Sequence, residues 1–210
     1  MKQFIPFLAL FGFFNPILAQ IDSSQQAEKL MQQAIIHYDG RRFERSLSLL
    51  DEAILWNNQP QLLDILYYYR ALAYINLEQK KAAISNLNLA IDNLYQQKPH
   101  YYSLLGKLYF EAKSWDLAVA NFKLSLAQKP MQAESLTLWA AVELERGQAE
   151  ASLQRLNLAI ETDKNYAAAY YYRGLAYFEL LEPTLACQDW EMGINLGFEP
   201  LKELKKQFCK

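Results

Sequence analysis

Cysteine, histidine and the residues that break helices are scarce in this sequence. Its 210 residues include two cysteines, two histidines, seven glycines and seven prolines. The cysteines and histidines are too few for a structural zinc cluster and fall at no ligand spacing; His37 and His100 stand alone. The sequence also has no Gly-rich phosphate loop and no serine in a Gly-flanked turn. We therefore expect a helix-rich, non-catalytic protein with no metal and no cofactor.

An excess of charge of either sign is also absent. The chain carries 21 lysines and arginines against 23 aspartates and glutamates, a net charge of −2. No broad positive field can therefore hold nucleic acid or an anionic membrane, and reading of RNA by helical repeats is disfavoured for the same reason. Proteins or peptides are the expected partners.

No hydrophobic run is long enough to cross a bilayer. Residues 1–19 contain one lysine, an apolar run from Phe4 to Phe14, then Asn15-Pro16 and a small residue at Ala19. The apolar stretch falls short of the ~20 residues that a spanning helix needs, so a signal peptide cut after Ala19 is favoured over a transmembrane anchor. No cysteine follows to carry a lipid. We expect an exported bacterial protein, periplasmic or extracellular, without stable membrane insertion after cleavage.

What the sequence does contain is an octapeptide that occurs twice. Tyr67–Tyr74 reads YYYRALAY, and Tyr170–Tyr177, 103 residues later, reads YYYRGLAY. Two weaker copies, Tyr102–Tyr109 and Leu136–Glu143, divide the interval into steps of 35, 34 and 34 residues. A fixed period near 34 residues in a helix-forming background is typical of a helical solenoid.

Each repeat is predicted to be a pair of helices that hides one apolar stripe and needs a neighbour to bury its core. Ahead of the repeats, residues 20–26 form a polar lead in which Ser23 and Gln26 make a capping box for the first helix. A short helix with a stripe of Leu201, Leu204 and Phe208 is expected to cap the far end, its lysines facing water. The five pairs are placed at residues 27–60, 61–97, 98–130, 131–164 and 165–199, and the capping helix at 200–210.

These pairs resemble tetratricopeptide repeats. The family places large and small residues at fixed offsets, so that Gly or Ala on one helix receives a large side chain of the other. The matching residues are, in the second pair, Tyr67, Ala71, Tyr74, Ala83, Leu87 and Ala90; in the third, Tyr102, Gly106, Tyr109, Ala118, Phe122 and Pro130; in the fifth, Tyr170, Gly174, Tyr177, Ala186, Trp190 and Gly193. The departures are His37 and Glu143 where an aromatic is usual, Ser46 and Ser152 where Ala is usual, and Lys164 where Pro is usual.

The resemblance implies an all-α, right-handed α-solenoid that acts as a non-catalytic scaffold for protein interactions. In this family the first helix of each pair lines a concave groove, and here those faces are largely apolar or aromatic. Such a stripe is typical of a site for a peptide or a partner helix. The predicted groove residues are Tyr38, Tyr68, Leu72, Ile75, Phe110, Leu144, Tyr171, Leu175 and Phe178.

Four acidic residues recur at the ends of the predicted first helices: Asp39, Glu111, Glu145 and Glu179. The helix macrodipole disfavours negative charge at a C-terminus, so stability alone would not select this acidic rim. One hypothesis is a partner segment with Lys or Arg beside apolar residues; the alternative is that these are chance surface acids on glutamate-rich helices.

Cys187 lies on the last predicted repeat and Cys209 near the end of the capping helix. In an exported protein these two residues are candidates for a disulfide that ties the end of the chain to its body. The alternative is two independent thiols, because sequence alone does not show that their Cα atoms come within reach.

Two other functions stay open alongside peptide binding. One is an envelope-assembly adaptor for a membrane complex. The other is a self-assembling structural solenoid, a homo-oligomer in which aromatic-rich units stack end to end.

Overall fold

The structure of the chain is a computed structural model. It describes residues 16–94 and 96–209, with side chains from Ser23 onward except Ser24. Most of the predicted signal peptide, residues 1–15, lies outside the described residues. Within them the chain forms eleven α-helices and no strand.

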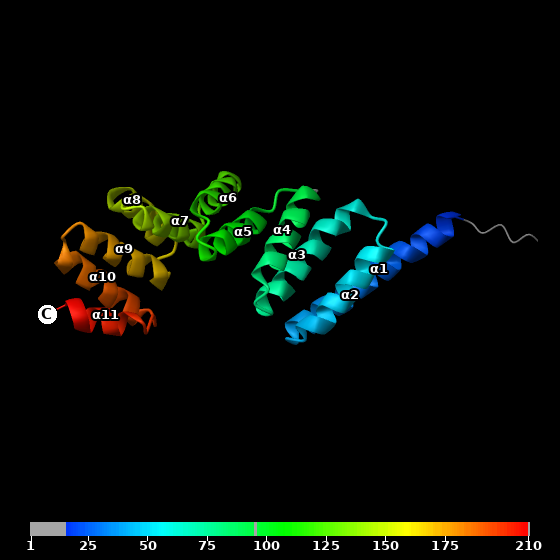
Figure 1. Cartoon of the computed structure of the whole chain (residues 1–210), viewed down its shortest axis with the longest axis horizontal. Helices are drawn as coiled ribbons and strands as arrows, with labels where there is room; N and C mark the ends of the chain where they lie inside the picture. Colours follow the sequence, from blue (N-terminus) through cyan, green and yellow to red (C-terminus); the bar gives the residue numbers. More distant parts are fainter. Residues whose placement is uncertain (1–15, 95, 210) are drawn as a thin grey trace, which may run out of the picture.

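The helices pair in sequence order as antiparallel hairpins that follow one another along an arc (Figure 1). A short final helix packs on the last hairpin. This arrangement confirms the predicted all-α solenoid of five hairpins and a capping helix. The helices are α1 (Pro16–Asp39) with α2 (Phe43–Trp56), α3 (Pro60–Asn76) with α4 (Lys80–Asp92), α5 (Pro99–Glu111) with α6 (Trp115–Gln128), α7 (Ala133–Glu145) with α8 (Ala149–Thr162), α9 (Ala167–Glu179) with α10 (Pro183–Asn195), and α11 (Leu201–Phe208).

The first helix starts earlier than predicted. The capping box indicated a start at Ser23, whereas α1 begins at Pro16, so Ser23 lies inside the helix and that prediction is wrong. Proline is favoured in the first turn of a helix, and no helix breaker separates it from Ser23. The Ser23 hydroxyl accepts a hydrogen bond from Asn58 Nδ2 at 2.7 Å, which links α1 to the connection before α3.

All five hairpins close with the same backbone turn. One residue in each turn adopts a φ between 56° and 70°. The residue after it donates its backbone N–H to the carbonyl five residues earlier, at 2.8 to 2.9 Å. This satisfies a carbonyl at the end of the first helix. The five residues with positive φ are Arg41, Glu78, Lys113, Gly147 and Leu181.

Large side chains of the second helices fit against small residues of the first helices. The Phe122 ring of α6 is fully buried against Gly106 of α5, where an added Cβ would stand 2.6 Å from the ring. Trp190 of α10 occupies the corresponding place against Gly174 of α9. These contacts confirm the close helix approach expected from the repeat pattern.

In both copies of the octapeptide, the arginine links its hairpin to the preceding one. Arg173 on α9 donates through Nε and Nη2 to the two carboxylate oxygens of Asp189 on α10, each at 2.7 Å. Its Nη1 reaches Asn157 on the preceding helix α8 at 2.8 Å. Arg70 on α3 forms an ion pair with Asp51 on the preceding helix α2 at 3.3 Å.

Replacing Gly106 with alanine tests the close approach of α5 and α6. Alanine favours a helix interior by about 1 kcal/mol over glycine, but a methyl group here overlaps the buried Phe122 ring. Such overpacking typically costs about 1–3 kcal/mol, so we expect a lower free energy of unfolding in urea denaturation followed by circular dichroism. In a Phe122→Leu background the same substitution should be neutral or stabilising. A more stable single variant would contradict this account.

The two arginine pairs give a matched comparison. The two arginine side chains are equally exposed, but the Asp189 carboxylate is 7% exposed and accepts two hydrogen bonds from Arg173, so Asp189→Ala removes a largely buried charge pair and should lower the free energy of unfolding by about 3 kcal/mol. The Asp51 carboxylate is 57% exposed, so Asp51→Ala should cost less than about 1 kcal/mol. Equal losses of unfolding free energy in the two urea titrations would show that burial of the carboxylate does not determine how much each ion pair stabilises the protein.

Candidate functional site

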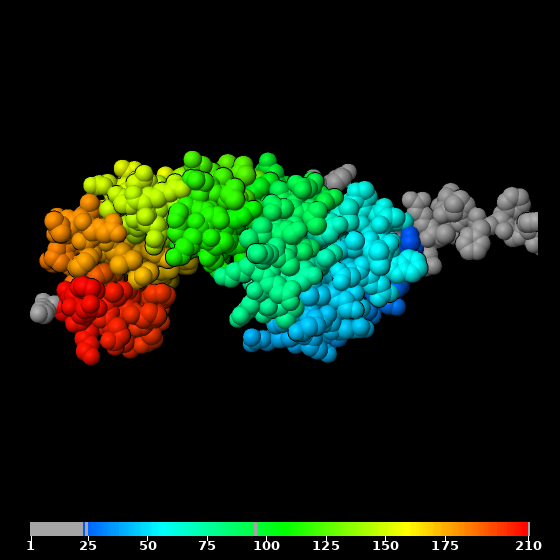
Figure 2. All heavy atoms as spheres, viewed as in Figure 1, coloured from blue at the N-terminus to red at the C-terminus, as the bar shows by residue number. Residues whose placement is uncertain are grey.

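The arc is hollowed on one side, between the α3–α4 hairpin and helices α10 and α11 (Figure 2). Two pockets are built from the first helices of successive hairpins. The upstream pocket, of about 280 Å³, lies on α3, α5 and α7 and is lined by Tyr68, Leu72, His100, Ser103, Leu104, Lys107, Gln132, Glu134 and Ser135. The downstream pocket, of about 360 Å³, lies on α7 and α9 and is lined by Ala141, Leu144, Glu145, Tyr172, Leu175, Phe178 and Glu179.

An aromatic cluster forms one wall of the upstream pocket. The Tyr68 ring stacks on Tyr101 with centroids 4.3 Å apart, and the His100 ring meets Tyr68 edge-on at 5.4 Å. The Tyr101 hydroxyl donates a hydrogen bond to the buried carboxylate of Asp64, which also forms an ion pair with Lys98. Burial raises the pKa of Tyr68, and burial together with Asp64 raises that of Tyr101. Burial, then the positive charge of Lys98, lowers the pKa of His100.

Hydroxyl and amide groups form the opposite side of the upstream pocket. Ser103 Oγ lies 2.7 Å from both Ser125 Oγ and Ser135 Oγ, and it donates to Gln132 Oε1 at 3.2 Å. These residues come from α5, α6, α7 and the residue before α7, so the network joins two hairpins. At the rim Lys107 Nζ pairs with Glu134 Oε1 at 2.7 Å. The pocket thus combines a flat aromatic wall with a hydrogen-bonding wall.

The downstream pocket has apolar walls and an acidic mouth. Leu144 and Leu175 form the interior, and Phe178 is 39% exposed beside them. Glu145 and Glu179 end helices α7 and α9, and both carboxylate side chains are exposed. Neither forms an ion pair with any residue that the structure describes. This arrangement presents two uncompensated negative charges above an apolar surface.

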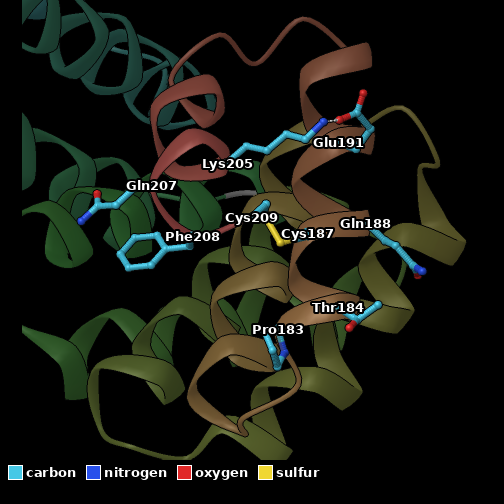
Figure 3. Close-up of a pocket in the computed structure, with 9 residues that line it drawn as sticks. All are labelled: Pro183, Thr184, Cys187, Gln188, Glu191, Lys205, Gln207, Phe208 and Cys209. Atoms are coloured by element: carbon cyan, nitrogen blue, oxygen red, sulfur yellow. Dashed lines mark hydrogen bonds and ion pairs between the residues drawn. A yellow bond between two sulfur atoms is a disulfide. The ribbon is translucent and has the colours of Figure 1, made fainter.

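The disulfide predicted from the sequence is present. Cys187 on α10 and Cys209, directly after α11, are bonded, with their Cα atoms 5.8 Å apart (Figure 3). The two cysteines are 22 residues apart in the sequence, and the bond joins the residue after α11 to the last hairpin. A disulfide of this kind favours an oxidising compartment.

No helix formed by residues 16–94 and 96–209 is long and apolar enough to cross a bilayer. Within the same ranges, no group of three or more His, Cys, Asp or Glu side chains is placed to hold a metal ion.

The sequence matches no protein-family model and no curated protein. Solved structures do match. YrrB, described as a TPR protein with an unusual peptide-binding site, superposes with a TM-score of 0.72 at 17% identity, over 91% of this chain and 97% of that one. MamA residues 41 to the end from Desulfovibrio magneticus RS-1 give 0.72 at 15%, over 83% and 96%. Another MamA structure gives 0.70 at 14%, over 89% and 97%. This is the tetratricopeptide-repeat fold.

In this tetratricopeptide-repeat fold, five of the nine predicted groove residues line a pocket. Tyr68 and Leu72 belong to the upstream pocket. Leu144, Leu175 and Phe178 belong to the downstream pocket. The predicted stripe is thus divided into two separate pockets on the first helices.

The other four predicted groove residues line neither pocket and contact neighbours within the solenoid. The Tyr38 hydroxyl accepts a hydrogen bond from Asn76 at 3.1 Å. Phe110 packs against Trp115, and Tyr171 against Phe198, with centroids 5.4 and 5.6 Å apart. Ile75 packs against the core that α3, α4 and α5 share.

The predicted acidic rim is also divided. Glu145 and Glu179 flank the downstream pocket. Glu111 pairs with Lys80 at 2.7 Å, and Asp39 is exposed at the end of α1, away from both pockets.

Several pocket residues near the beginnings of the first helices were not predicted from the sequence. Gln132 directly precedes α7 and Glu134 is in its first turn, while His100 is in the first turn of α5. The apolar repeat pattern carries no signal for such positions. The only hint for His100 was its place next to Pro99, a helix start.

The pKa of His100 provides a test of the aromatic wall. Because folding lowers it below 6.5, the folded state binds this proton less tightly than the unfolded chain. Its contribution to stability is therefore complete above about pH 6.5 and is lost as the pH falls through the lowered pKa. NMR titration should give a pKa below 6.5 for the His100 imidazole. His100→Gln should reduce the loss of unfolding free energy on the acid side of the pH profile. His37→Gln, which leaves His100 in place, assigns the signals. A His100 pKa at or above 6.5 would contradict its burial in the aromatic wall beside Lys98.

Proposed function

We propose that the chain is a non-catalytic interaction scaffold that binds a peptide segment of a partner protein across the two pockets. The observation that carries the proposal is the downstream pocket, where an apolar surface lies beneath two unpaired glutamates. The similarity to YrrB, a TPR protein with a peptide-binding site, supports the same class of ligand at the level of the fold.

The downstream pocket suits a lysine or arginine side chain. Glu145 and Glu179 end their helices, where the backbone carbonyls already carry partial negative charge, so a cation gains from both sources. The methylene groups of a Lys or Arg side chain can lie along Leu175 and Phe178 while the charged group stays in water between the carboxylates. The partner segment is therefore basic and apolar at this point.

The upstream pocket suits a flat or polar residue of the same segment. The Tyr68 ring offers a stacking surface, and Ser103 and Gln132 offer hydrogen-bonding groups. Along α7, Ser135 of the upstream pocket and Leu144 of the downstream pocket are nine residues apart, or about 14 Å. An extended peptide covers that distance with about four residues. The proposed ligand thus has an aromatic or polar residue about four positions from a basic one.

Export to the bacterial periplasm or cell exterior is part of this proposal. It is supported by the disulfide between Cys187 and Cys209 and by the signal-peptide pattern of residues 1–19. The relevant partner would then be another exported or envelope protein.

The test uses fluorescently labelled twelve-residue peptides with a phenylalanine or tyrosine four positions from a lysine or arginine, and a matched set with glutamate in place of the base. Fluorescence anisotropy should show binding of the basic set only. Reversing both acids, Glu145→Lys with Glu179→Lys, should weaken that binding about tenfold, since two exposed ion pairs are together worth about 1–2 kcal/mol.

A matched control reverses two exposed glutamates of α8, Glu150→Lys with Glu161→Lys, which lie outside both pockets. This control should bind nearly as the natural protein does. Binding of neither peptide set would overturn the proposal. Equal weakening by both double reversals would show that net charge, not the pocket, attracts the peptide.

A further inference from the structure

The capping helix reaches the downstream pocket through one aromatic side chain. The ring of Phe208, the last residue of α11, lies 4.9 Å from Phe178, which lines that pocket. Phe208 also lies 6.2 Å from Trp190, and Trp190 lies 6.0 Å from Phe178. The three rings form one cluster that reaches the downstream pocket at Phe178.

α11 is held differently at its two ends. At its start, Leu201 is fully buried against Gly193 of α10, where an added Cβ would overlap it. At its end, Cys209 is bonded to Cys187 directly after Phe208. A helix of eight residues is too short to be stable by itself, so the place of its last turn depends on these anchors.

Figure 3 shows Phe208 next to the Cys187–Cys209 bridge, and Lys205 one turn earlier on the helix reaching Glu191 of α10. This ion pair between half-exposed side chains contributes little compared with a covalent bond. Leu204 packs against the core of the last hairpin, and the bridge is the covalent constraint on the last turn of α11.

The bridge is open to solvent. Both cysteines are partly exposed and line a pocket of about 730 Å³, the largest of those described, together with Thr184, Gln188 and Lys205 among others. A small dithiol, or a dithiol-bearing protein, can reach the sulfur atoms from this side.

We propose that Phe208 is a positioning residue of the downstream pocket and that the Cys187–Cys209 disulfide, by holding Phe208 on Phe178, makes peptide binding dependent on redox state. Reduction by a dithiol passes two electrons and two protons to the cysteines, giving two thiols, while the dithiol closes to its own disulfide. The last turn of α11 is then free and Phe208 leaves Phe178. Phe178 then lacks the ring that packs against it, and the affinity of the downstream pocket for the basic and apolar peptide segment falls. The affinity change rests on the proposed function; the loss of ring contact does not.

Two measurements test this inference on the full chain. Hydrogen exchange is measured by mass spectrometry with and without dithiothreitol. After reduction, residues 175–179 should exchange about fivefold faster, which is the change in opening equilibrium expected when one aromatic contact is lost. Anisotropy with the basic peptides should show affinity weakened by the same factor. Phe208→Ala should reproduce both changes with the disulfide intact.

The controls separate this effect from general loosening. Cys187→Ser with Cys209→Ser should behave as the reduced protein and should not respond to dithiothreitol. Leu55→Ala, which shortens an 86% exposed side chain on α2, should change nothing.

The outcomes are distinguishable. Unchanged exchange in residues 175–179, whether or not α11 itself exchanges faster, overturns the inference, as does a Phe208→Ala variant indistinguishable from the natural protein in exchange. If the oxidised protein binds no peptide, the proposed function fails, while the exchange data still decide whether the bridge holds Phe208 on Phe178. If peptide binds equally well in both redox states, the proposed function stands and the redox dependence is wrong.

Discussion

The α5–α6 and α9–α10 hairpins depend on the close approach of two helices at a glycine. Where α5 presents Gly106, the second helix can place a phenylalanine ring directly on backbone, and where α9 presents Gly174 it can place an indole. The helices come close because one side of the contact has no side chain. This leaves the other apolar faces of each hairpin uncovered, so the next hairpin must bury them. The arc, its ends and its pockets all follow from that requirement.

The repeated octapeptide shows how one sequence segment serves two different surroundings. Arg70 forms an ion pair with Asp51 on the second helix of the preceding hairpin. Arg173 pairs instead with Asp189 on the second helix of its own hairpin, and it donates a hydrogen bond to Asn157 on the preceding one. Sixteen residues after Arg70, at the position that corresponds to Asp189, the sequence has Asn86. Each guanidinium therefore has one negative partner, which belongs to the neighbouring hairpin in one copy and to the arginine's own hairpin in the other.

The candidate site belongs to no single hairpin. Each pocket takes its walls from the first helices of consecutive hairpins, so its shape depends on how those hairpins turn relative to one another. On the α9–α10 hairpin, α11 with its disulfide packs in the place of a neighbouring hairpin. The pocket nearest that end therefore borders on the cap, through Phe178 and Phe208. The stability of the chain end and the form of the proposed site are coupled there.

The sequence by itself determined the helical class and the 34-residue period, because these follow from the spacing of residues along the chain, and the resemblance to tetratricopeptide repeats implied the contacts of Gly106 and Gly174. It offered Cys187 and Cys209 as candidates for a disulfide, but that their Cα atoms come within reach was decided by the tertiary structure. The sequence did not determine which groove positions line a pocket: Tyr68 does, whereas Tyr171 packs under Phe198. Nor did it show that four of five hairpin turns would carry a non-glycine residue at positive φ. Those features were decided by the tertiary structure, because the rotation between hairpins and the strain accepted in a turn depend on packing from both sides, which no local pattern records.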